Sequence, residues 1–122
     1  MGIGDPSGVL DAIACGVDLF DCVLPTRTAR MGTAFTREGR INLRNAQHAL
    51  SGEPIDEECS CIACTSFTRG AIRHLVAQKE ILGLMLLTEH NLTHLATLVR
   101  DAREAILRGR FTAFRRETNS SC

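Results

Sequence analysis

The sequence predicts a small domain of the α/β class. A short apolar segment between Gly16 and Pro25 has the composition of a buried strand, and the segments before and after it carry apolar residues at helical spacing. Of the 122 residues, 44% are apolar and 23% are charged, which is typical of globular proteins. We therefore expect one domain, or part of a larger one, with an apolar core of its own.

Two further features of the sequence concern its compartment. The longest apolar run, residues 81–87, is much shorter than the ~20 residues of a membrane helix. The opening MGIGDPSG lacks the basic and apolar regions of a signal peptide, so we expect a cytoplasmic protein.

Three of the six cysteines lie within six residues at C-x-C-x-x-C spacing, which favours a metal site over a disulfide framework.

The first predicted element is a helix over residues 6–16. Asp5 is its expected N-cap, Pro6 suits its first position, and Gly16 ends it. Residues 17–23, VDLFDCV, follow as a short and mostly apolar segment, which we expect to be a buried strand.

The rest of the chain is predicted to form a hairpin, a cysteine-rich turn and helices. The strongest helical pattern covers residues 90–109, where Leu92, Leu95, Leu98, Val99, Ala102, Ala105 and Ile106 recur at i, i+3, i+4 spacing. The other expected elements, in order, are a loop that becomes a β-hairpin (24–45, with its turn at 37–39), a short helix or turn (46–54), a helix (65–80), an extended segment (81–89) and a frayed polar tail (115–122).

Charge is unevenly distributed although the formal net charge is zero. Residues 25–48 contain one acid, Glu38, and five arginines: Arg27, Arg30, Arg37, Arg40 and Arg44. Such a local field can bind phosphate groups even on a neutral protein. A solvated loop with scattered charges explains the same composition, and the two interpretations stay open at this point.

A metal site at Cys59, Cys61 and Cys64 needs a fourth ligand to complete a tetrahedral shell. His74 lies ten residues after Cys64 on the expected helix, about 15 Å along its axis, which is too far. The expected helix climbs ~24 Å, and the extended segment 81–89 can retrace that distance, which brings His90 back to the cysteines. His94, one turn further, is the rival ligand or a supporting residue; the remaining candidates are His48, Cys15, Cys22 and Cys122. A closed shell makes the ion structural rather than catalytic.

Asp21 is the carboxylate that most needs an explanation. Strand alternation places it on one face with three aliphatic residues, and a buried carboxylate is costly unless it is paired or hydrogen bonded. A structural interpretation makes it a cap for the next turn or a partner of Arg27 or Arg30. A functional interpretation makes it an active-site residue, because the carboxyl ends of parallel strands build the active sites of α/β barrels.

Four segments of this chain resemble the tRNA-guanine transglycosylases of queuosine biosynthesis, most closely the bacterial branch. They are MGIG, GVDLFDCVLPTRTARMG, CSCIAC and EHNL, in this order, and the resemblance covers nearly the whole chain. It implies the C-terminal part of a (β/α)₈ TIM barrel with an inserted zinc-binding subdomain, ending in long α-helices. Residues 1–34 would hold the last barrel elements with the catalytic strand and an arginine loop, and residues 35–122 the hairpin, the zinc subdomain and the C-terminal helices.

The resemblance also implies an activity and a set of site residues. The family exchanges guanine at the anticodon wobble position of tRNA for a 7-deazaguanine base, either 7-aminomethyl-7-deazaguanine or queuine. Asp21 matches the nucleophile, which forms a covalent bond to ribose. The other matching positions are Arg27 and Arg30 for the anticodon loop, Met1 and Gly2 for the base pocket, and Cys59, Cys61, Cys64 and His90 for one structural zinc ion per chain.

One departure from the family pattern shapes the expected activity. The family carries its general acid/base in an N-terminal portion that has no counterpart here, so we expect no turnover by this chain alone. The alternative is a non-catalytic, zinc-stabilised module that binds tRNA or a partner protein. A homodimer is among the assemblies that the resemblance implies, and a membrane is not among the expected partners.

Overall fold

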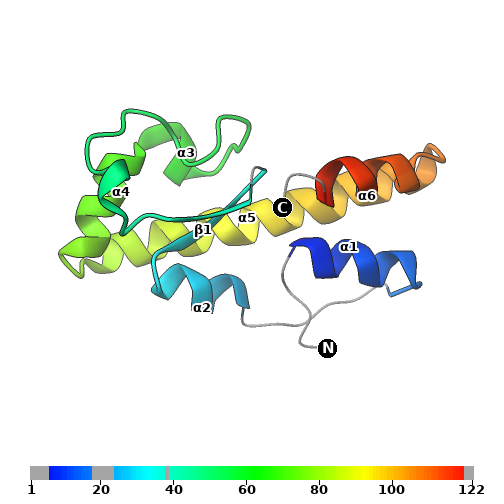
Figure 1. Cartoon of the computed structure of the whole chain (residues 1–122), viewed down its shortest axis with the longest axis horizontal. Helices are drawn as coiled ribbons and strands as arrows, with labels where there is room; N and C mark the ends of the chain where they lie inside the picture. Colours follow the sequence, from blue (N-terminus) through cyan, green and yellow to red (C-terminus); the bar gives the residue numbers. More distant parts are fainter. Residues whose placement is uncertain (1–5, 18–23, 38, 120–122) are drawn as a thin grey trace.

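The long helix α5 (Ile81–Leu107) organises the molecule, and five of the other described helices and the first strand of a hairpin pack against it in the computed structural model (Figure 1). The structure describes residues 6–17, 24–37 and 39–119. The other elements are α1 (Pro6–Ala14), α2 (Leu24–Arg30), β1 (Thr33–Thr36), β2 (Gly39–Asn42), the 3₁₀ helix η1 (Ala46–His48), α3 (Ile62–Ser66), α4 (Arg69–Ala77) and α6 (Phe111–Asn119). Asp5 and residues 18–23 of the expected strand lie outside the described residues.

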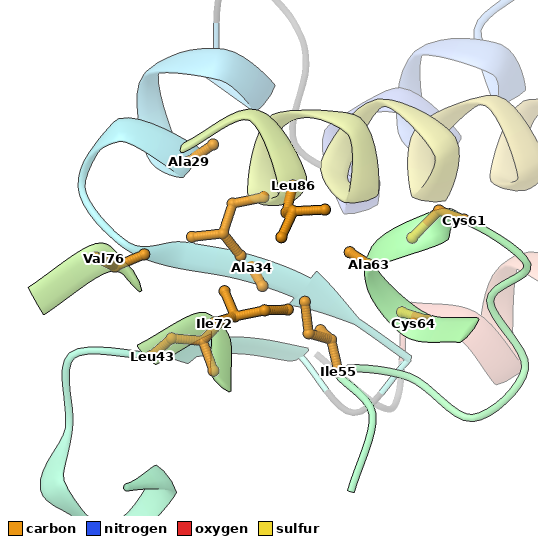
Figure 2. Packing of buried hydrophobic residues seen from close by; sticks show 11 residues of the cluster. Ala29, Ala34, Leu43, Ile55, Cys61, Ala63, Cys64, Ile72, Val76 and Leu86 are labelled. Carbon is orange, nitrogen blue, oxygen red and sulfur yellow. The ribbon is translucent and has the colours of Figure 1, made fainter. Parts of the chain in front are cut away.

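Two apolar clusters form along α5, whose 27 residues span about 40 Å. Towards its C-terminus, Leu98 and Ala102 pack with Leu10 of α1 and with two phenylalanines of α6, Phe111 and Phe114. Towards its N-terminus a larger cluster joins α5 to α2, the hairpin, α3 and α4 (Figure 2). In the described part of the chain, no helix combines the length and the apolar character that crossing a membrane requires.

The hairpin was correctly predicted, and its register determines which edge faces α5. Thr33 pairs with Asn42 and Thr36 with Gly39, so the turn lies between Thr36 and Gly39 as expected. Leu43 N donates to Gly32 O at 2.8 Å. Because hydrogen-bonded pairs alternate along an antiparallel ladder, Thr33 and Phe35 point their backbone groups away from β2 and towards α5.

Residues 24–30 form a helix, and the prediction of a loop there was wrong. Pro25 is compatible with a first helical turn, and Thr28 Oγ1 donates to Leu24 O at 2.8 Å within it. Pro25, Thr28 and Ala29 are buried on one side of this short helix. A seven-residue helix gains little from its own hydrogen bonds, so packing decides its conformation, and packing leaves no local sequence signal.

The region 65–89 also differs from its prediction. The expected helix over 65–80 is broken, because Phe67 and Thr68 are extended and Thr68 Oγ1 caps α4 by accepting a hydrogen bond from Ala71 N at 3.1 Å. The expected extended segment 81–89 is the beginning of α5. A short apolar run reads equally well as a strand or a buried helix, so periodicity alone does not separate the two. The polar tail is likewise ordered as α6 up to Asn119, with Arg115 bonded to Asp11 of α1 at 2.7 Å.

Gly83 permits the close approach of α4 to α5, and its replacement by alanine is expected to destabilise the fold. A Cβ at this position would lie 3.0 Å from Leu75 Cβ and from Val76 N, so the two helices would have to move apart. We expect Gly83→Ala to lower the free energy of unfolding by up to about 2 kcal/mol, because overpacking costs about 1–3 kcal/mol and alanine gains ~1 kcal/mol in helix propensity. Urea denaturation measures the difference. Gly52→Ala, where a Cβ meets nothing within 4 Å, is the control, and equal midpoints for both variants would contradict this account.

Candidate metal centre

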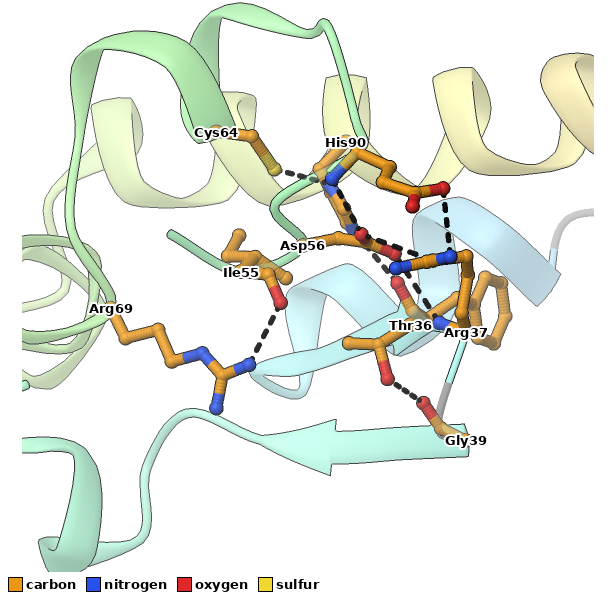
Figure 3. Close-up of polar contacts among 10 residues, drawn as sticks. Thr36, Arg37, Gly39, Ile55, Asp56, Cys64, Arg69 and His90 are labelled. Carbon is orange, nitrogen blue, oxygen red and sulfur yellow. Dashed lines mark hydrogen bonds and ion pairs between the residues drawn. The ribbon is translucent and has the colours of Figure 1, made fainter. Parts of the chain in front are cut away.

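Four side chains from two distant parts of the sequence, the cysteine segment 59–64 and helix α5, meet at one place. The ligand atoms of Cys59, Cys61, Cys64 and His90 all lie within 4.8 Å of one another. His90 Nδ1 is 3.2 Å from Cys64 Sγ (Figure 3) and 3.5 Å from Cys61 Sγ. Two ligands of a tetrahedral zinc ion at ordinary Zn–S and Zn–N distances are about 3.6 Å apart, so the four atoms surround a space of the right size.

Local structure explains how the cysteines converge. Cys61 is the N-cap of α3 and Cys64 lies in its first turn, where Cys64 N donates to Cys61 O at 3.1 Å. Cys59 precedes them in a turn closed by its own N–H, which donates to Asp56 O at 3.2 Å. The C-x-C-x-x-C spacing thus places all three sulfurs on the inner side of one short loop and helix.

His90 reaches the cysteines by a different route from the predicted one. The nine residues of α4 carry the chain about 13 Å away, and the nine steps from Ile81 to His90 along α5 return it by the same distance. A helical hairpin therefore does what the extended segment was expected to do. The choice of His90 as the fourth ligand is confirmed, whereas the reasoning about residues 81–89 was wrong.

The tautomer of His90 is fixed by the hairpin. Its Nε2 lies 2.7 Å from Phe35 O, and a carbonyl oxygen can only accept, so Nε2 carries the proton. Burial lowers the pKa of His90, which keeps the ring neutral. Nδ1 therefore turns an unprotonated lone pair towards the sulfurs, as a metal ligand requires, and the Phe35 carbonyl orients the ring from behind.

The burial and the proximity of the three cysteine sulfurs favour binding of a cation. Burial raises the pKa of Cys59, and it raises the pKa of Cys64 well above its usual range, to which the neighbouring sulfurs of Cys61 and Cys59 add. Three thiolates in one buried space repel one another, and a divalent ion is the partner that stabilises them together. Four protein ligands fill a tetrahedral shell, so the ion has a structural role.

His94 lies behind the site and is not one of the four ligands. Its ring centroid is 6.3 Å from that of His90 and 6.1 Å from that of Phe35. Burial and the neighbouring His90 lower the pKa of His94 to about 4, so it is neutral at physiological pH.

Asp56 joins the cysteine loop to the hairpin turn, and the sequence reasoning missed it (Figure 3). Its carboxylate accepts from Glu58 N at 3.0 Å and from Arg37 N at 3.3 Å. The Arg37 guanidinium lies 3.5 Å from this carboxylate and 2.7 Å from that of Glu58. An aspartate that bonds a backbone N–H two residues ahead is an Asx turn, which is the signal that the sequence offered. Arg37 therefore belongs to the scaffold.

Asn91 is the second residue that the sequence reasoning missed. It is fully buried, and its carboxamide faces the edge of β1 that β2 leaves open. Oδ1 accepts from Phe35 N at 3.0 Å, and Nδ2 donates to Thr33 O at 3.0 Å and to Pro25 O at 3.1 Å. His90 and Asn91 together satisfy this strand edge with side chains.

Arg27 and Arg30 lie on the exposed side of α2, opposite its buried face. They are three residues apart in a helix, so both project from the same side. Within the described ranges, neither lies within ion-pair distance of a carboxylate, and Arg44 joins them by donating to Arg30 O at 3.4 Å. Arg40 lies over the Phe35 ring, 5.4 Å from its centroid. The other predicted site residues, Met1, Gly2 and Asp21, lie outside the residues that the structure describes.

Comparison with known proteins identifies the family. The model of the queuine tRNA-ribosyltransferase family matches residues 1–122. The chain belongs to this family. Curated proteins named queuine tRNA-ribosyltransferase are 50% identical in Sphingopyxis alaskensis, 48% in Desulfosudis oleivorans and 50% in Bacillus subtilis, over 94%, 95% and 96% of this chain. The matched region is 31%, 30% and 31% of those proteins, so the chain spans about a third of their length. Its Cys₃His group corresponds to the structural zinc site of the queuine tRNA-ribosyltransferase family.

Replacing the histidines separately tests the ligand set. We expect the purified chain to contain about one equivalent of zinc, His90→Gln to lose it, and His94→Gln to retain it, because only His90 turns a ring nitrogen to the sulfurs. Metal analysis and thermal unfolding measure both properties. Cys59 and His94 line a cleft of about 430 Å³, which admits a chelator from that side. Chelation should unfold the cysteine loop, since the binding energy of a structural zinc is folding energy. Well under one equivalent in the unmodified protein would reject the site.

Proposed function

We propose that this chain acts in the exchange of guanine for a 7-deazaguanine base at the wobble position of tRNA. The observation that carries the proposal is the identity of about 50% to queuine tRNA-ribosyltransferases along the chain. The meeting of Cys59, Cys61, Cys64 and His90 in one buried group supports it. In this proposal residues 1–34 supply the end of a (β/α)₈ barrel, and residues 35–122 supply the hairpin, the zinc subdomain and the C-terminal helices.

Asp21 is the proposed nucleophile. Its carboxylate oxygen would attack C1′ of the wobble ribose and displace guanine, which leaves with the electron pair of the glycosidic bond and takes up a proton at its ring nitrogen. The incoming base would then attack C1′ from the opposite side, release Asp21 and give up its own proton, so the configuration is retained overall. Zinc takes no part in either step, because its four protein ligands leave no position for a reacting group.

Arg27 and Arg30 are the proposed contacts to the anticodon loop. Their shared exposed side of α2 and the absence of a carboxylate partner among the described residues support this assignment. Met1 and Gly2 are proposed for the base pocket on the family match alone. The chemistry would need a general acid/base from outside these assigned residues, so the exchange experiment below supplies one.

The exchange experiment tests Asp21. The chain is mixed with tRNA that carries labelled guanine at the wobble position, alone and together with the N-terminal two thirds of the Bacillus subtilis relative. We expect label release only from the mixture, and we expect Asp21→Asn to lower it by roughly 10³-fold or more, as loss of a nucleophile does. Asp101→Asn, in an exposed ion pair on α5, is the matched control. Binding of tRNA without Asp21-dependent release would favour the non-catalytic module.

The arginines are tested by binding alone. Arg27→Ala and Arg30→Ala should each weaken binding of an anticodon stem-loop and reduce the magnitude of the salt slope by up to about 0.7, because each removes one phosphate or base contact on a single-stranded loop. Arg37→Ala removes the same charge from a side chain that is held by Asp56 and Glu58, and serves as the control. Equal effects of all three variants would mean that only general charge matters.

A further inference from the structure

Asn91 connects the metal centre to the helix that carries the proposed tRNA contacts. It follows the ligand His90 on α5 and has no exposed surface. Its Oδ1 holds Phe35 N in β1 at 3.0 Å, and its Nδ2 holds Pro25 O in α2 at 3.1 Å. One carboxamide of α5 thus joins β1 and α2, and each of its partners lies more than fifty residues away in the sequence.

The chemistry of this position is specific to a carboxamide of this length. It needs an acceptor on one side, for Phe35 N, and donors on the other, for Pro25 O and Thr33 O. Aspartate offers the acceptor but opposes its second oxygen to the two carbonyls, and leucine offers neither group. A buried polar group that loses its hydrogen-bond partner is strongly unfavourable, because it keeps the cost of desolvation without the bond. Any substitution of Asn91 therefore leaves at least one of these buried backbone groups without its hydrogen bond.

Helix α2 is held from its buried face, and the Asn91 carboxamide is one of the groups that contact it there. It has seven residues, which is too few for a stable isolated helix, and its buried face lies against α5 and β1. Nδ2 of Asn91 lies 3.4 Å from Thr28 Oγ1 as well as 3.1 Å from Pro25 O, so it meets two successive buried positions of the helix. Arg27 and Arg30 project from the opposite side, so a shift of the buried face moves both of them.

We propose that Asn91 is a positioning residue, which sets α2 and its two arginines at a fixed place relative to the zinc-bound His90. The part that concerns tRNA rests on the proposed function, whereas the part that concerns α2 does not. In this view the zinc centre, the edge of β1 and the arginine face of α2 form one rigid unit.

The test uses Asn91→Asp, which retains the acceptor, and Asn91→Ala, which leaves a small space that water can enter. Asn45→Asp, at an exposed position with no side-chain cap bond, is the control for the added charge. Hydrogen exchange of the amides in α2 and α4, zinc content, and affinity for an anticodon stem-loop with guanine at the wobble position are measured on the full chain. We expect one equivalent of zinc and unchanged α4 amides in both Asn91 variants, with α2 amides exchanging at least tenfold faster.

A double-mutant cycle separates positioning from general stability. Arg27→Ala should weaken stem-loop binding less in the Asn91→Asp background than in the unmodified chain, because the arginine is already displaced. Equal effects in both backgrounds, or α2 amides that exchange as in the unmodified chain, would overturn the proposal. Loss of zinc or of α4 protection in both Asn91 variants would also overturn it, because Asn91 would then be a general core residue. If the unmodified chain binds no stem-loop, the proposed function fails, while the exchange rates of α2 still decide whether Asn91 positions the helix.

Discussion

The open edge of β1 is the constraint on which the rest of the structure depends. A two-stranded hairpin is marginally stable by itself, and a buried strand edge leaves N–H and C=O groups without partners. In this protein two consecutive side chains of α5 satisfy the groups of this edge. Asn91 accepts from Phe35 N and donates to Thr33 O, and His90 donates to Phe35 O. Because His90 uses Nε2 for this bond, its Nδ1 is left for the metal. One turn of α5 therefore fixes the hairpin, orients a ligand and, through Pro25, places α2.

The metal ion supplies cohesion that the apolar core of this region does not. Many residues in the cluster are small, including Ala29, Ala34 and Ala63, and two of its members are the ligands Cys61 and Cys64. The segment from η1 to α3 contains no regular element over residues 49–61, and a connection of that length is costly to order. Arg69 donates hydrogen bonds to two of its carbonyls, Pro54 O and Ile55 O, at 2.9 Å each. Figure 3 shows the bond to Ile55. The ion then ties the end of this segment to α5.

Features with a short-range signal could be predicted from the sequence, and features set by packing could not. The hairpin turn and the cysteine spacing are local, and both predictions were confirmed. Helix α2 and the first turns of α5 are stabilised by contacts with distant residues. Local composition therefore led to the wrong predictions of a loop and of an extended segment there. Asn91 gave no signal, because an asparagine after a histidine does not indicate which backbone groups lie above it. The helix that the apolar periodicity predicted over residues 90–109 is confirmed within α5, but its apolar residues are not equally buried: Leu98, Ala102 and Ala105 are buried, whereas Leu92 is 49% and Ile106 is 51% exposed. Periodicity finds an apolar stripe but does not say how much of it this chain covers.

Zero net charge changes how the proposed interaction with tRNA has to work. A strongly basic protein gathers nucleic acid through its overall field, but here the acids of the cysteine loop neutralise Arg37 and only a few arginines remain on and beside α2. Two phosphate contacts on a single-stranded loop contribute a salt slope of only about −1.4, so charge alone gives weak binding. Selectivity would then come from the geometry with which these few groups are held. Two side chains of α5 hold that geometry. The Asn91 carboxamide and the His90 imidazole bind the N–H and the C=O of Phe35, and Asn91 also binds Pro25 O in the helix from which the arginines project.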